Sequence, residues 1–434
     1  MAIGIGLLGL GTVGAGVAQI LASPEGRHPL VRALQLRRVA VRDLGRPRPI
    51  ELPAALFSTD PAAVVADPAV EIVVEVMGGL EPARSLILAA IAAGKPVVTA
   101  NKAVIARHGA EIAAAAAEKG VYVLMEAAVG GGIPILEPLK QSLGANRIER
   151  VSGIINGTTN YILSRMAEEG ASYEAVLADA QALGYAEADP AADVQGGDAA
   201  DKIAILTGLA YGGLVDRQAI PTEGIDQLQT RDIDYARELG FSVKLLAVAQ
   251  RQGSDPDGTE VLDVRVHPTL LPKDHPLAGV NGVNNAILVE GEPVGRVMFY
   301  GPGAGAGPTA SAVVADILNI AAIRQVAGPS TQLDPLLAAG SWRRCRLVES
   351  GLTHHRNYVR FQAADLPGVI GHIGSCFGAE EVSLQSIVQF ESEGPGAEIV
   401  VITHAVEEAR FRRALGAILA RPEVEAITSC LRTL

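Results

Sequence analysis

The chain has 434 residues, of which 49% are apolar and only 4% aromatic, and it contains 48 glycines. This length exceeds what one hydrophobic core normally supports, so we expect two or three domains of α/β type. The net charge of −12 argues against a nucleic-acid-binding protein, because such a protein needs a basic surface. Three scattered cysteines fit neither a metal centre nor a disulfide framework, so we expect a reducing, cytoplasmic setting.

We expect no membrane-spanning segment, because no run of eighteen or more apolar residues is free of both glycine and charge. The first apolar run, residues 2–21, lacks a basic start and carries five glycines within its first fourteen residues. A signal peptide is therefore a poor interpretation, and a strand, a turn and a helix fit the run better.

A glycine-rich turn follows the first predicted strand, residues 3–8. The sequence from Gly9 to Gly14 is G-x-G-x-x-G, and a helical run to about residue 21 follows it. The first glycine permits a tight turn, the second lets backbone approach a pyrophosphate, and the third lets the helix pack on the strand. The motif predicts a dinucleotide site, with packing alone as the alternative. Its candidate cofactor contacts are Gly9, Gly11, Thr12, Val13 and Gly14.

Strands and helices alternate through the first third of the chain. We expect strands at 34–41, 71–77, 96–100 and 121–127, and helices at 81–93 and 103–119. This alternation predicts a doubly wound parallel sheet of Rossmann type over residues 1–135. Ligands bind beyond the carboxyl ends of strands in such sheets. The residues that follow those ends are Arg42, Gly78, Gly79, Asn101, Lys102 and Glu126.

Arg42 directly follows the second strand, where the adenosine ribose of a dinucleotide normally lies. An arginine there can pair with the 2′-phosphate of NADP, whereas an acidic residue favours NAD. We therefore expect NADP as the cofactor. NAD stays possible, because the acidic residue Asp43 stands next to Arg42. Lys102, in "TANKA", follows a strand inside the expected crevice, which suits chemistry better than a surface position does.

Carboxylates gather around one lysine between residues 184 and 204. Helical spacing of the apolar residues from Ile203 onward puts Asp198 and Lys202 on one face, a turn apart. A solvated loop with a surface ion pair is the alternative interpretation. Gly196 and Gly197 argue against it, because glycine before a helix costs stability unless something approaches the backbone closely.

The middle of the chain, residues 136–307, reads as an α+β domain for substrate binding and dimerisation. We expect Thr158 to be the N-cap of a helix, and strands at 241–250, 260–268 and between 285 and 300. A glycine-rich turn then opens a helix over 308–327. We expect this helix to return to the nucleotide domain and to bring Gly303 near the nicotinamide end of the cofactor.

A linker over residues 328–356 leads to a C-terminal domain over 357–434. Adjacent histidines at 354–355 point apart in extended chain, so we expect no metal there. The last domain reads strand, helix, strand, strand, helix, strand, the ferredoxin-like βαββαβ order. With "ADLPGVIGHIG" at its first turn it resembles an ACT domain, a class that binds amino acids at domain pairs. A ligand-free assembly module is the alternative.

The stretch from Ala180 to Lys202, A-x3-G-Y-x-E-x-D-P-x2-D-V-x-G-x-D-x3-K, resembles the signature of the homoserine dehydrogenase family. "GLGTVG", "TANKA", "EAAVGGGIPI", "NGTTNYIL" and "YGPGAG" resemble other blocks of that family in the right order. The resemblance covers roughly residues 1–330. It implies interconversion of L-homoserine and L-aspartate 4-semialdehyde with NAD(P), in threonine, methionine and isoleucine biosynthesis.

The resemblance also implies roles for individual residues. It makes Lys202 the general acid/base and lets Lys102 support the chemistry and touch the cofactor. It assigns the substrate to Glu187, Asp193 and Asp198. Further cofactor contacts are Gly184, Glu187 and Gly303. A catalytic lysine needs a lowered pKa, which Lys102 favours by repulsion and the carboxylates oppose, and the sequence leaves that balance open.

The glycine loop at 126–135 raises the question of a metal. One carboxylate and exposed backbone carbonyls suit a hard cation bound through oxygen, and a plain glycine loop is the alternative. The resemblance implies a monovalent cation, Na⁺ by preference. Its candidate ligands are Glu126, Val129, Gly131 and Ile133.

A non-catalytic protein that senses NAD(P) and an amino acid is the alternative function. Retention of both Lys102 and Lys202 argues against it, because sensing needs no proton-transfer lysine. An acylating aldehyde dehydrogenase needs a cysteine nucleophile, and no cysteine precedes Cys345. We expect a homodimer or homotetramer, threonine as an effector at the ACT domain, and catalysis that does not need the tail.

Overall fold

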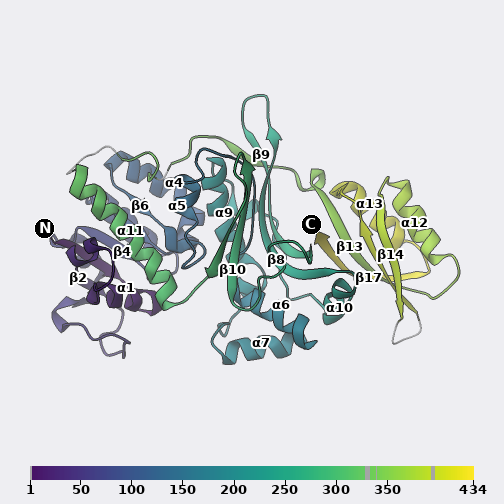
Figure 1. Cartoon of the computed structure of the whole chain (residues 1–434), viewed down its shortest axis with the longest axis horizontal. Coiled ribbons are helices and arrows are strands. Elements are labelled where there is room, and N and C mark those ends of the chain that lie inside the picture. The colour runs from purple at the N-terminus through teal and green to yellow at the C-terminus, as the bar shows by residue number, and fades with distance from the viewer. Residues whose placement is uncertain (1, 328–332, 339, 392–395) are drawn as a thin grey trace.

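Two β-sheets organise the chain in a computed structural model that describes every residue except 1, 328–332, 339 and 392–395. A six-stranded sheet forms the N-terminal end of an elongated molecule (Figure 1). An 11-stranded sheet runs from the middle of the molecule into its C-terminal end. The active-site candidates must therefore be found where these two sheets and their helices meet.

The six-stranded sheet is parallel throughout and has the order β3-β2-β1-β4-β5-β6. This order confirms the predicted doubly wound fold. Its strands are β1 (Ile3–Leu8), β2 (Leu34–Ala40), β3 (Phe57–Ser58), β4 (Ile72–Glu75), β5 (Val97–Thr99) and β6 (Val123–Leu124). Its flanking helices are α1 (Thr12–Ala22), α2 (Pro61–Ala66), α3 (Ala83–Ala92), α4 (Lys102–Lys119) and α11 (Ala306–Ala327).

Both faces of the parallel sheet are covered. Val73 belongs to the core beneath α2, α3 and α4, whereas its neighbour Val74 belongs to the core beneath α1 and α11. Successive side chains of a strand point to opposite faces, which explains this division. It also explains why the predicted strands are nearly continuous apolar runs.

Helix α11 returns to the nucleotide domain from the end of the second sheet, as predicted. It packs on α1, where a Cβ at Gly16 would lie 2.5 Å from the Ala306 carbonyl oxygen. By length and hydropathy α11 could cross a membrane, yet Ile317 and Ile320 are fully buried in the core of this domain. Its apolar composition is therefore explained by packing between α1 and the sheet.

The middle of the chain supplies five antiparallel strands of the second sheet, in the order β11-β10-β7-β8-β9. These strands are β7 (Arg147–Ile154), β8 (Phe241–Ser254), β9 (Glu260–Pro272), β10 (Asn284–Glu292) and β11 (Gly295–Pro302). The helices of this region, several of which cover the sheet, are α5 (Leu136–Lys140), α6 (Gly157–Glu169), α7 (Tyr173–Ala182), α8 (Ala191–Val194), α9 (Gly197–Tyr211) and α10 (Thr230–Glu238).

Helix α6 is capped differently from the prediction. The side-chain oxygen of Asn156 accepts a hydrogen bond from the Thr159 backbone N–H at 2.8 Å, so Asn156 is the N-cap and the prediction for Thr158 is wrong. Thr158 lies inside the helix, and its hydroxyl donates to the Tyr185 carbonyl oxygen at 2.8 Å. Asparagine and threonine both cap helices well, so composition alone did not separate the two positions.

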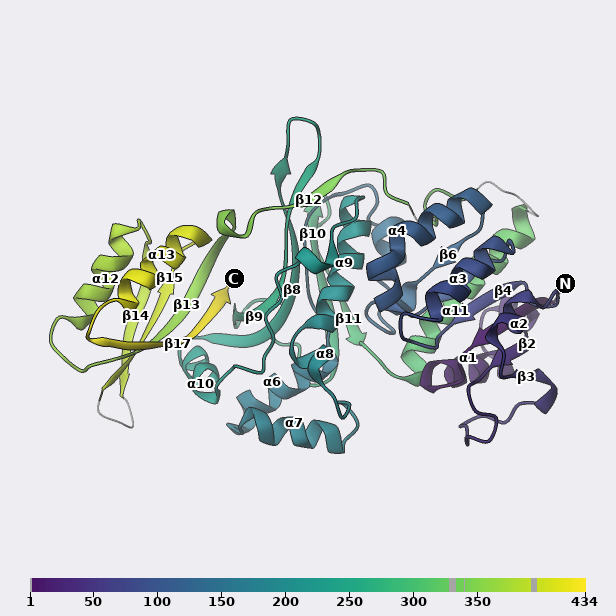
Figure 2. The same cartoon turned by 180° about the vertical axis from the view of Figure 1, so that it is seen from behind.

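The C-terminal region has the predicted βαββαβ order, and its helices lie on one side of the sheet (Figure 2). Its elements are β13 (His354–Ala363), α12 (Val369–Ala379), β14 (Leu384–Glu391), β15 (Ala397–Thr403), the short β16 (Val406–Glu407), α13 (Glu408–Leu419) and β17 (Val424–Thr433). The strand order β17-β13-β15-β14 is antiparallel throughout, which confirms the ferredoxin-like fold. His354 is exposed and His355 is buried on β13.

The C-terminal region is not structurally separate, because its strands belong to the same 11-stranded sheet as those of the middle region. The last strand, β17, pairs in parallel with β9, with Arg432 opposite Thr269. Before it, β12 (Cys345–Leu347) pairs with the other end of β9. The linker predicted at 328–356 therefore includes a bound strand, while its residues 328–332 and 339 lie outside the described part of the chain.

A buried ionic cluster also joins the tail to α10. The Arg360 guanidinium of β13 forms ion pairs with Asp232 at 2.8 Å and with Glu398 at 3.0 Å. It donates a further hydrogen bond to Gln229 at 2.5 Å, and the Tyr235 hydroxyl donates to Glu398. We call Arg360, Asp232, Glu398, Gln229 and Tyr235 the junction cluster. All hydrogen-bonding positions of a guanidinium are directed outward in a plane, which suits such a multiple contact.

Candidate active site

The glycine turn after β1 divides its three glycines between folding and ligand access. Gly9 has φ +103°, and a Cβ at Gly14 would lie 2.2 Å from the Gly9 carbonyl oxygen, so both positions need glycine for the fold. A Cβ at Gly11 would meet no atom within 4 Å. Helix α1 begins at the next residue and no side chain caps it. The open backbone before the helix is therefore suited to a phosphate.

The carboxyl ends of β4 and β5 meet as predicted. Gly78 and Gly79 both have positive φ, and the Asn101 side-chain amide donates to the Gly79 carbonyl oxygen at 2.8 Å. The Asn101 side-chain oxygen accepts from the Val104 N–H, which starts α4. Lys102 is the first residue of that helix, so the cap holds it at the edge of the parallel sheet.

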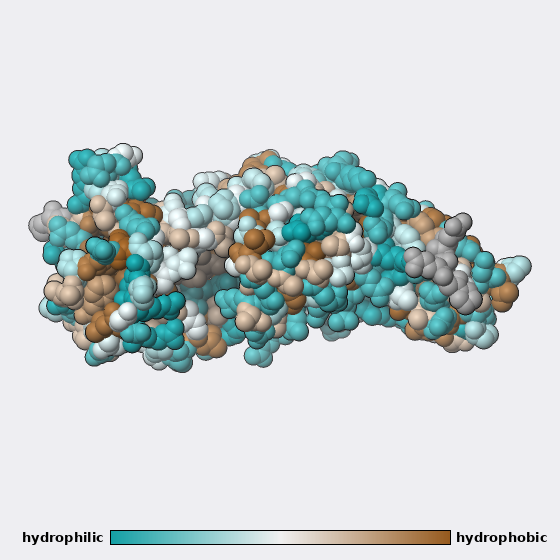
Figure 3. Space-filling model, turned by 90° about the horizontal axis from the view of Figure 1, so that it is seen from below, coloured by the Kyte–Doolittle hydropathy of each residue, from teal (hydrophilic) through white to brown (hydrophobic). Residues whose placement is uncertain are grey.

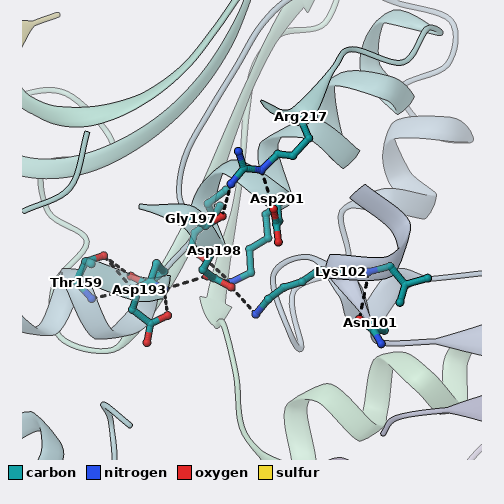
Figure 4. Close-up of polar contacts among 12 residues, drawn as sticks. Asn101, Lys102, Thr159, Asp193, Gly197, Asp198, Asp201 and Arg217 are labelled. Carbon is teal, nitrogen blue, oxygen red and sulfur yellow. Dashed lines mark hydrogen bonds and ion pairs between the residues drawn. The ribbon is translucent and has the colours of Figure 1, made fainter. Parts of the chain in front are cut away.

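Lys102 and Lys202 converge on one carboxylate, that of Asp198 (Figure 4). Lys102 forms an ion pair with Oδ1 of Asp198, and the Lys202 ammonium lies 2.7 Å from Oδ2. Asp198 and Lys202 are a turn apart on α9, whereas Lys102 comes from α4 of the nucleotide-binding region. We call these three residues the lysine–aspartate cluster. It joins helix α4 of the parallel-sheet region to helix α9 of the middle region.

Asn156 is the member of the site that the sequence analysis missed as a functional residue. Its side-chain amide donates to Asp193 at 2.7 Å and to Oδ2 of Asp198 at 2.9 Å, while its carbonyl caps α6. The neighbouring Ile155 carbonyl oxygen accepts from Lys202 at 2.7 Å. The available signal was a polar residue directly after a buried strand, at the position where a helix must begin.

The two lysines differ in exposure and in pKa. Burial lowers the pKa of Lys202, and repulsion from Lys102 adds to this, so the net pKa falls although Asp198 opposes it. Burial also acts to lower the pKa of Lys102, but attraction to Asp198 outweighs it and the net pKa rises. The Lys202 side chain is 10% exposed and that of Lys102 is 41% exposed. Lys202 is therefore the better proton carrier of the two.

Asp198 stays ionised between the lysines. Burial alone would raise its pKa, but Lys202 and Lys102 lower that pKa by a larger amount. An ionised carboxylate fixes the direction of both ammonium groups, since it accepts from each. Asp193 is half-buried beside this cluster and accepts a hydrogen bond from Asn156. Its charge also favours the protonated form of both lysines.

The structure does not join Glu187 to this network. The Glu187 side chain is exposed, and it forms no hydrogen bond or ion pair with the residues that the structure describes. Gly184, with φ +76°, follows the end of α7 and needs glycine for that conformation. Both residues lie on the loop between α7 and α8, on the chain that leads into the site.

Arg42 follows β2 and is exposed. Its side chain makes no hydrogen bond or ion pair within the described ranges of the chain. The Asp43 side chain instead accepts from the Gly45 N–H at 2.8 Å, so its carboxylate is occupied within its own turn. Arg42 is therefore an exposed cation beyond the second strand, and Arg46 is a second exposed arginine of the same loop.

Glu126 is buried below the glycine loop and its carboxylate has three backbone donors. The N–H groups of Ile135, Leu136 and Glu137 donate to it at 2.5, 2.9 and 2.7 Å. The Glu126 N–H donates to Asp316 of α11 at 2.8 Å. A cation at this loop would therefore rely on backbone carbonyl oxygens.

The loop itself presents such oxygens. Within the described part of the chain, the carbonyl oxygens of Val129, Gly131 and Ile133 accept no hydrogen bond. Gly131 has φ +57°, and a Cβ there would lie 2.3 Å from the Gly303 carbonyl oxygen. Gly303 thus packs against this loop, and a Cβ on Gly303 would overlap Asn285.

A second carboxylate of α9 ties the site to its surroundings. Asp201 forms ion pairs with Arg107 of α4 at 3.1 Å and with Arg217 at 2.6 Å. Arg217 also donates to the Gly197 carbonyl oxygen at 3.0 Å (Figure 4).

The surface between the N-terminal region and the middle of the molecule is hollowed on the face seen in Figure 3.

Comparison with known proteins gives consistent matches along the chain. The model of the homoserine dehydrogenase NAD-binding domain matches residues 9–126, that of homoserine dehydrogenase matches 134–318, and that of the ACT domain matches 357–423. The chain is 57% identical to a homoserine dehydrogenase of Synechocystis sp. over the whole of both proteins. It is 42% identical to that of Corynebacterium glutamicum over 99% of this chain and 95% of the relative.

Solved structures agree with these matches. A homoserine dehydrogenase from Thiobacillus denitrificans superposes with a TM-score of 0.91 at 40% identity, covering 100% of this chain and 98% of that one. A hyperthermophilic archaeal homoserine dehydrogenase in complex with NADPH gives a TM-score of 0.61 at 27% identity, covering 76% of this chain and 100% of that one.

Proposed function

The chain belongs to the homoserine dehydrogenase family and is an NAD(P)-dependent oxidoreductase, and we propose that Lys202 is the general acid/base of its reaction. The reaction interconverts L-homoserine and L-aspartate 4-semialdehyde. The observation that carries the proposal is the lysine–aspartate cluster, in which one ionised carboxylate aligns two ammonium groups with different pKa shifts. The biosynthetic context we propose is that of threonine, methionine and isoleucine.

Lys202 acts on the substrate oxygen. In its neutral form it removes the hydroxyl proton of homoserine, and in the reverse direction its ammonium returns a proton to the aldehyde oxygen. The nicotinamide cofactor accepts or supplies the hydride. The lowered pKa of Lys202 supports this role, because a lysine at its ordinary pKa is almost fully protonated near neutral pH.

Lys102 and Asp198 prepare Lys202 for this exchange. Lys102 remains a cation, so it lowers the pKa of Lys202 by repulsion and polarises the substrate oxygen. Asp198 holds both ammonium groups in one place, and Asn156 holds Asp198. Lys102 also lies at the edge of the parallel sheet, where it can touch the cofactor.

The substrate ammonium is bound by carboxylates on the segment that precedes α9. Asp193 and Glu187 are proposed for this role together with Asp198. The half-buried position of Asp193 beside Asn156 supports it, and the unpaired side chain of Glu187 is free to turn toward a ligand. The positive charge of the substrate and the acidic segment are complementary.

The cofactor we propose is NADP, with NAD as a weaker alternative. Gly11 and the start of α1 would hold the phosphates, and Arg42 would read the 2′-phosphate. The exposed, unpaired Arg42 and the occupied carboxylate of Asp43 support this choice. The contacts proposed from the sequence also include Gly9, Thr12, Val13, Gly14, Gly184, Glu187 and Gly303.

We also propose a monovalent cation, Na⁺, at the loop that follows Glu126. The carbonyl oxygens of Val129, Gly131 and Ile133 suit it, because they are free of hydrogen bonds in the described chain. The Glu126 side chain fixes the loop through the amides of residues 135–137. Its own carbonyl oxygen accepts from the Val129 N–H at 3.5 Å, so only its second lone pair remains for the ion. Such an ion would hold the loop against Gly303.

The C-terminal region regulates the enzyme through a small amino acid, for which threonine is our candidate, and the enzyme works as a homodimer or homotetramer. The ACT-domain match supports an amino-acid ligand. An assembly role without a ligand is the alternative.

The decisive experiment for the activity is NADPH oxidation by the purified protein with L-aspartate 4-semialdehyde. Turnover that disappears in Lys202→Ala and persists in Lys119→Ala, an exposed lysine at the end of α4, is the expected result. A protein that binds NADPH and homoserine, detected by fluorescence, yet gives no turnover would be a sensor and would overturn the proposal.

A further inference from the structure

A cavity of about 550 Å³ lies where the tail meets the middle of the chain, away from the lysine–aspartate cluster. Its walls come from β9, from the segment 219–223, from residues 347–355, and from α13 and β17 of the tail. The tail elements α13 and β17 lie on the same side of β9 in Figure 2. A cavity of this volume accommodates a small molecule.

The cavity is lined by charges of both signs. Three carboxylates and three guanidinium groups face it: Glu223, Asp263, Arg265, Glu408, Arg412 and Arg432. Such a balanced lining fits neither a polyanion nor a polycation, since either would meet like charges at close range. It fits a ligand that carries one charge of each sign.

Some of these charges are already paired, and the pairing leaves two free groups on facing walls. Arg265 pairs with Asp263, and Glu408 accepts from both Arg412 and Arg432 through the same oxygen, Oε1. The terminal nitrogens of Arg412 donate to no residue that the structure describes, and neither does the Glu223 carboxylate accept from one.

Glu408 adds a second reason to expect a positively charged ligand group. The residue is 8% exposed, and its Oε2 has no hydrogen-bond partner within the described ranges. A buried carboxylate oxygen without a donor is unfavourable. A small rotation of this carboxylate turns the unpartnered oxygen toward the cavity, where a ligand ammonium can donate to it.

We infer that this cavity binds a zwitterionic α-amino acid, with its carboxylate at Arg412 and its ammonium between Glu223 and Glu408. The ligand then bridges the tail helix α13 and the segment 219–223 of the substrate-binding region. The inference rests on the proposed amino-acid regulation and gives it a site. The alternative position within the tail is the turn 365–368, which precedes α12.

The wall of the cavity is also the back of the active-site helix. Glu223 and Val266 are hydrogen-bonded through their backbones at 2.8 Å. Gly196 lies directly behind them, because a Cβ there would be 3.0 Å from Thr222 and 3.2 Å from Val266. Gly196 is the N-cap of α9, two residues before Asp198. The glycine that was unexplained in the sequence thus lets the cavity wall pack against the start of the catalytic helix.

Segment 217–223 reaches the catalytic helix at a second point as well. Arg217 holds Asp201 and the Gly197 carbonyl oxygen, both on α9. A ligand that pulls Glu223 toward the tail therefore acts on the start of α9 from two sides. We expect the ligand to change the position of Asp198 and so to inhibit turnover.

Binding to the full-length protein is the first measurement, by isothermal titration calorimetry with L-threonine, L-isoleucine and L-methionine. We expect saturable binding of at least one of them, weakened about 10- to 100-fold in Arg412→Ala and in Glu223→Gln, the effect of losing one charge-assisted contact. The matched control is Arg413→Ala, because Arg413 is the next residue of α13 and pairs with Glu380 instead. L-threoninol and 3-hydroxybutanoate, which lack the carboxylate or the ammonium, should bind more weakly than L-threonine.

Inhibition of NADPH oxidation is the second measurement. The concentration that half-inhibits the wild type should rise by the same factor in Arg412→Ala, and the uninhibited rate should stay unchanged. Three results overturn the inference: no binding of the three amino acids at millimolar concentration, binding lost in Asp365→Ala but kept in Arg412→Ala, or binding lost only in Asp193→Asn. The first of these leaves the dehydrogenase function intact if turnover is present. Binding without any turnover overturns the proposed function and leaves the site.

Discussion

The lysine–aspartate cluster and the junction cluster are both built from buried opposite charges, yet they share those charges in opposite ways. In the first, one carboxylate holds two lysines, of which Lys102 remains 41% exposed. In the second, one guanidinium holds two carboxylates, and Arg360 is only 2% exposed. A second arginine, Arg231, also pairs with Glu398 at 3.2 Å, so the charges of the junction are balanced. The first cluster thus keeps a reachable cation, whereas the cation of the second is enclosed.

The two clusters also differ in how many hydrogen-bond donors of their cations are already used. The donors of Arg360 are used by Asp232, Glu398 and Gln229, so no ligand can compete for them without exposing buried carboxylates. Lys102 forms one ion pair, and 41% of its side chain remains exposed. A buried ion pair by itself therefore says little about function, and the number of unused donors says more.

Lys202→Ala breaks the first cluster and should have the largest effect. We expect kcat to fall by about 10² to 10⁴-fold, the usual contribution of a general acid/base. NADPH affinity, measured by fluorescence titration, should change little because Lys202 is on the substrate side. A fall of less than tenfold would remove Lys202 from the mechanism.

Arg360→Ala breaks the second cluster and should act on stability instead. Glu398 would keep Arg231, but Asp232 would be left buried without the cation that Arg360 supplies. Removing the partner of a buried charge typically costs about 3–5 kcal/mol of unfolding free energy. Urea denaturation measures this loss. The control Arg346→Ala removes an exposed pair with Asp255 and should cost less than about 1 kcal/mol. Equal losses for both variants would contradict the contrast between the clusters.

Arg42→Ala tests whether the exposed Arg42, which has no ion pair within the described residues, binds the cofactor. We expect KM for NADP to rise about 10- to 100-fold and KM for NAD to stay the same, since only NADP carries the 2′-phosphate. Initial rates with each cofactor measure this. Arg37→Ala, an exposed arginine on β2, serves as the control and should alter neither value. An equal change for both cofactors would mean that Arg42 does not read the phosphate.

His355→Gln tests how buried arginines outside the junction cluster affect the pH dependence of stability. Burial, with repulsion from Arg265 and Arg432, lowers the pKa of His355 to about 2. Below pH 6.5 the unfolded chain binds a proton that the folded chain does not, so the unfolding free energy falls as the pH falls.

Between pH 6.5 and 5.0 the unfolding free energy of His355→Gln should decrease by roughly 1.5 kcal/mol less than that of the wild type. Urea denaturation at both pH values measures this difference. His404→Gln, at an exposed position, should keep the wild-type slope. The idea fails if the two variants lose stability in parallel.

Much of the fold follows from local sequence signals. The alternation of apolar runs and helices predicted the parallel sheet, and the final six elements predicted the ferredoxin-like unit. The pairing of β17 with β9 was not predictable, because it depends on two strands that are more than 150 residues apart in sequence. The cap of α6 was misassigned for a smaller reason, namely that Asn156 and Thr158 are both good capping residues.

The site likewise contains residues that local sequence spacing predicted and residues whose contacts depend on how the domains pack. Helical spacing was enough to bring Asp198 and Lys202 together, because both lie on α9. The direct contact of Lys102 with Asp198 depends on how two domains pack, and the same holds for the role of Asn156. Glu126 shows the opposite case, in which a residue chosen as a candidate ligand uses its carboxylate to hold three amides of its own chain.

The continuous central sheet has a consequence for how the protein is made. Strand β9 finds its neighbour at Thr269 and Leu270 only in the last residues of the chain, where the Leu434 N–H donates to the Leu270 carbonyl oxygen at 3.1 Å. During synthesis this end of β9 is an open strand edge until the C-terminus has left the ribosome, and open edges favour pairing with other chains. The tail thus closes this edge of β9 against strand pairing with other chains, and it does so last.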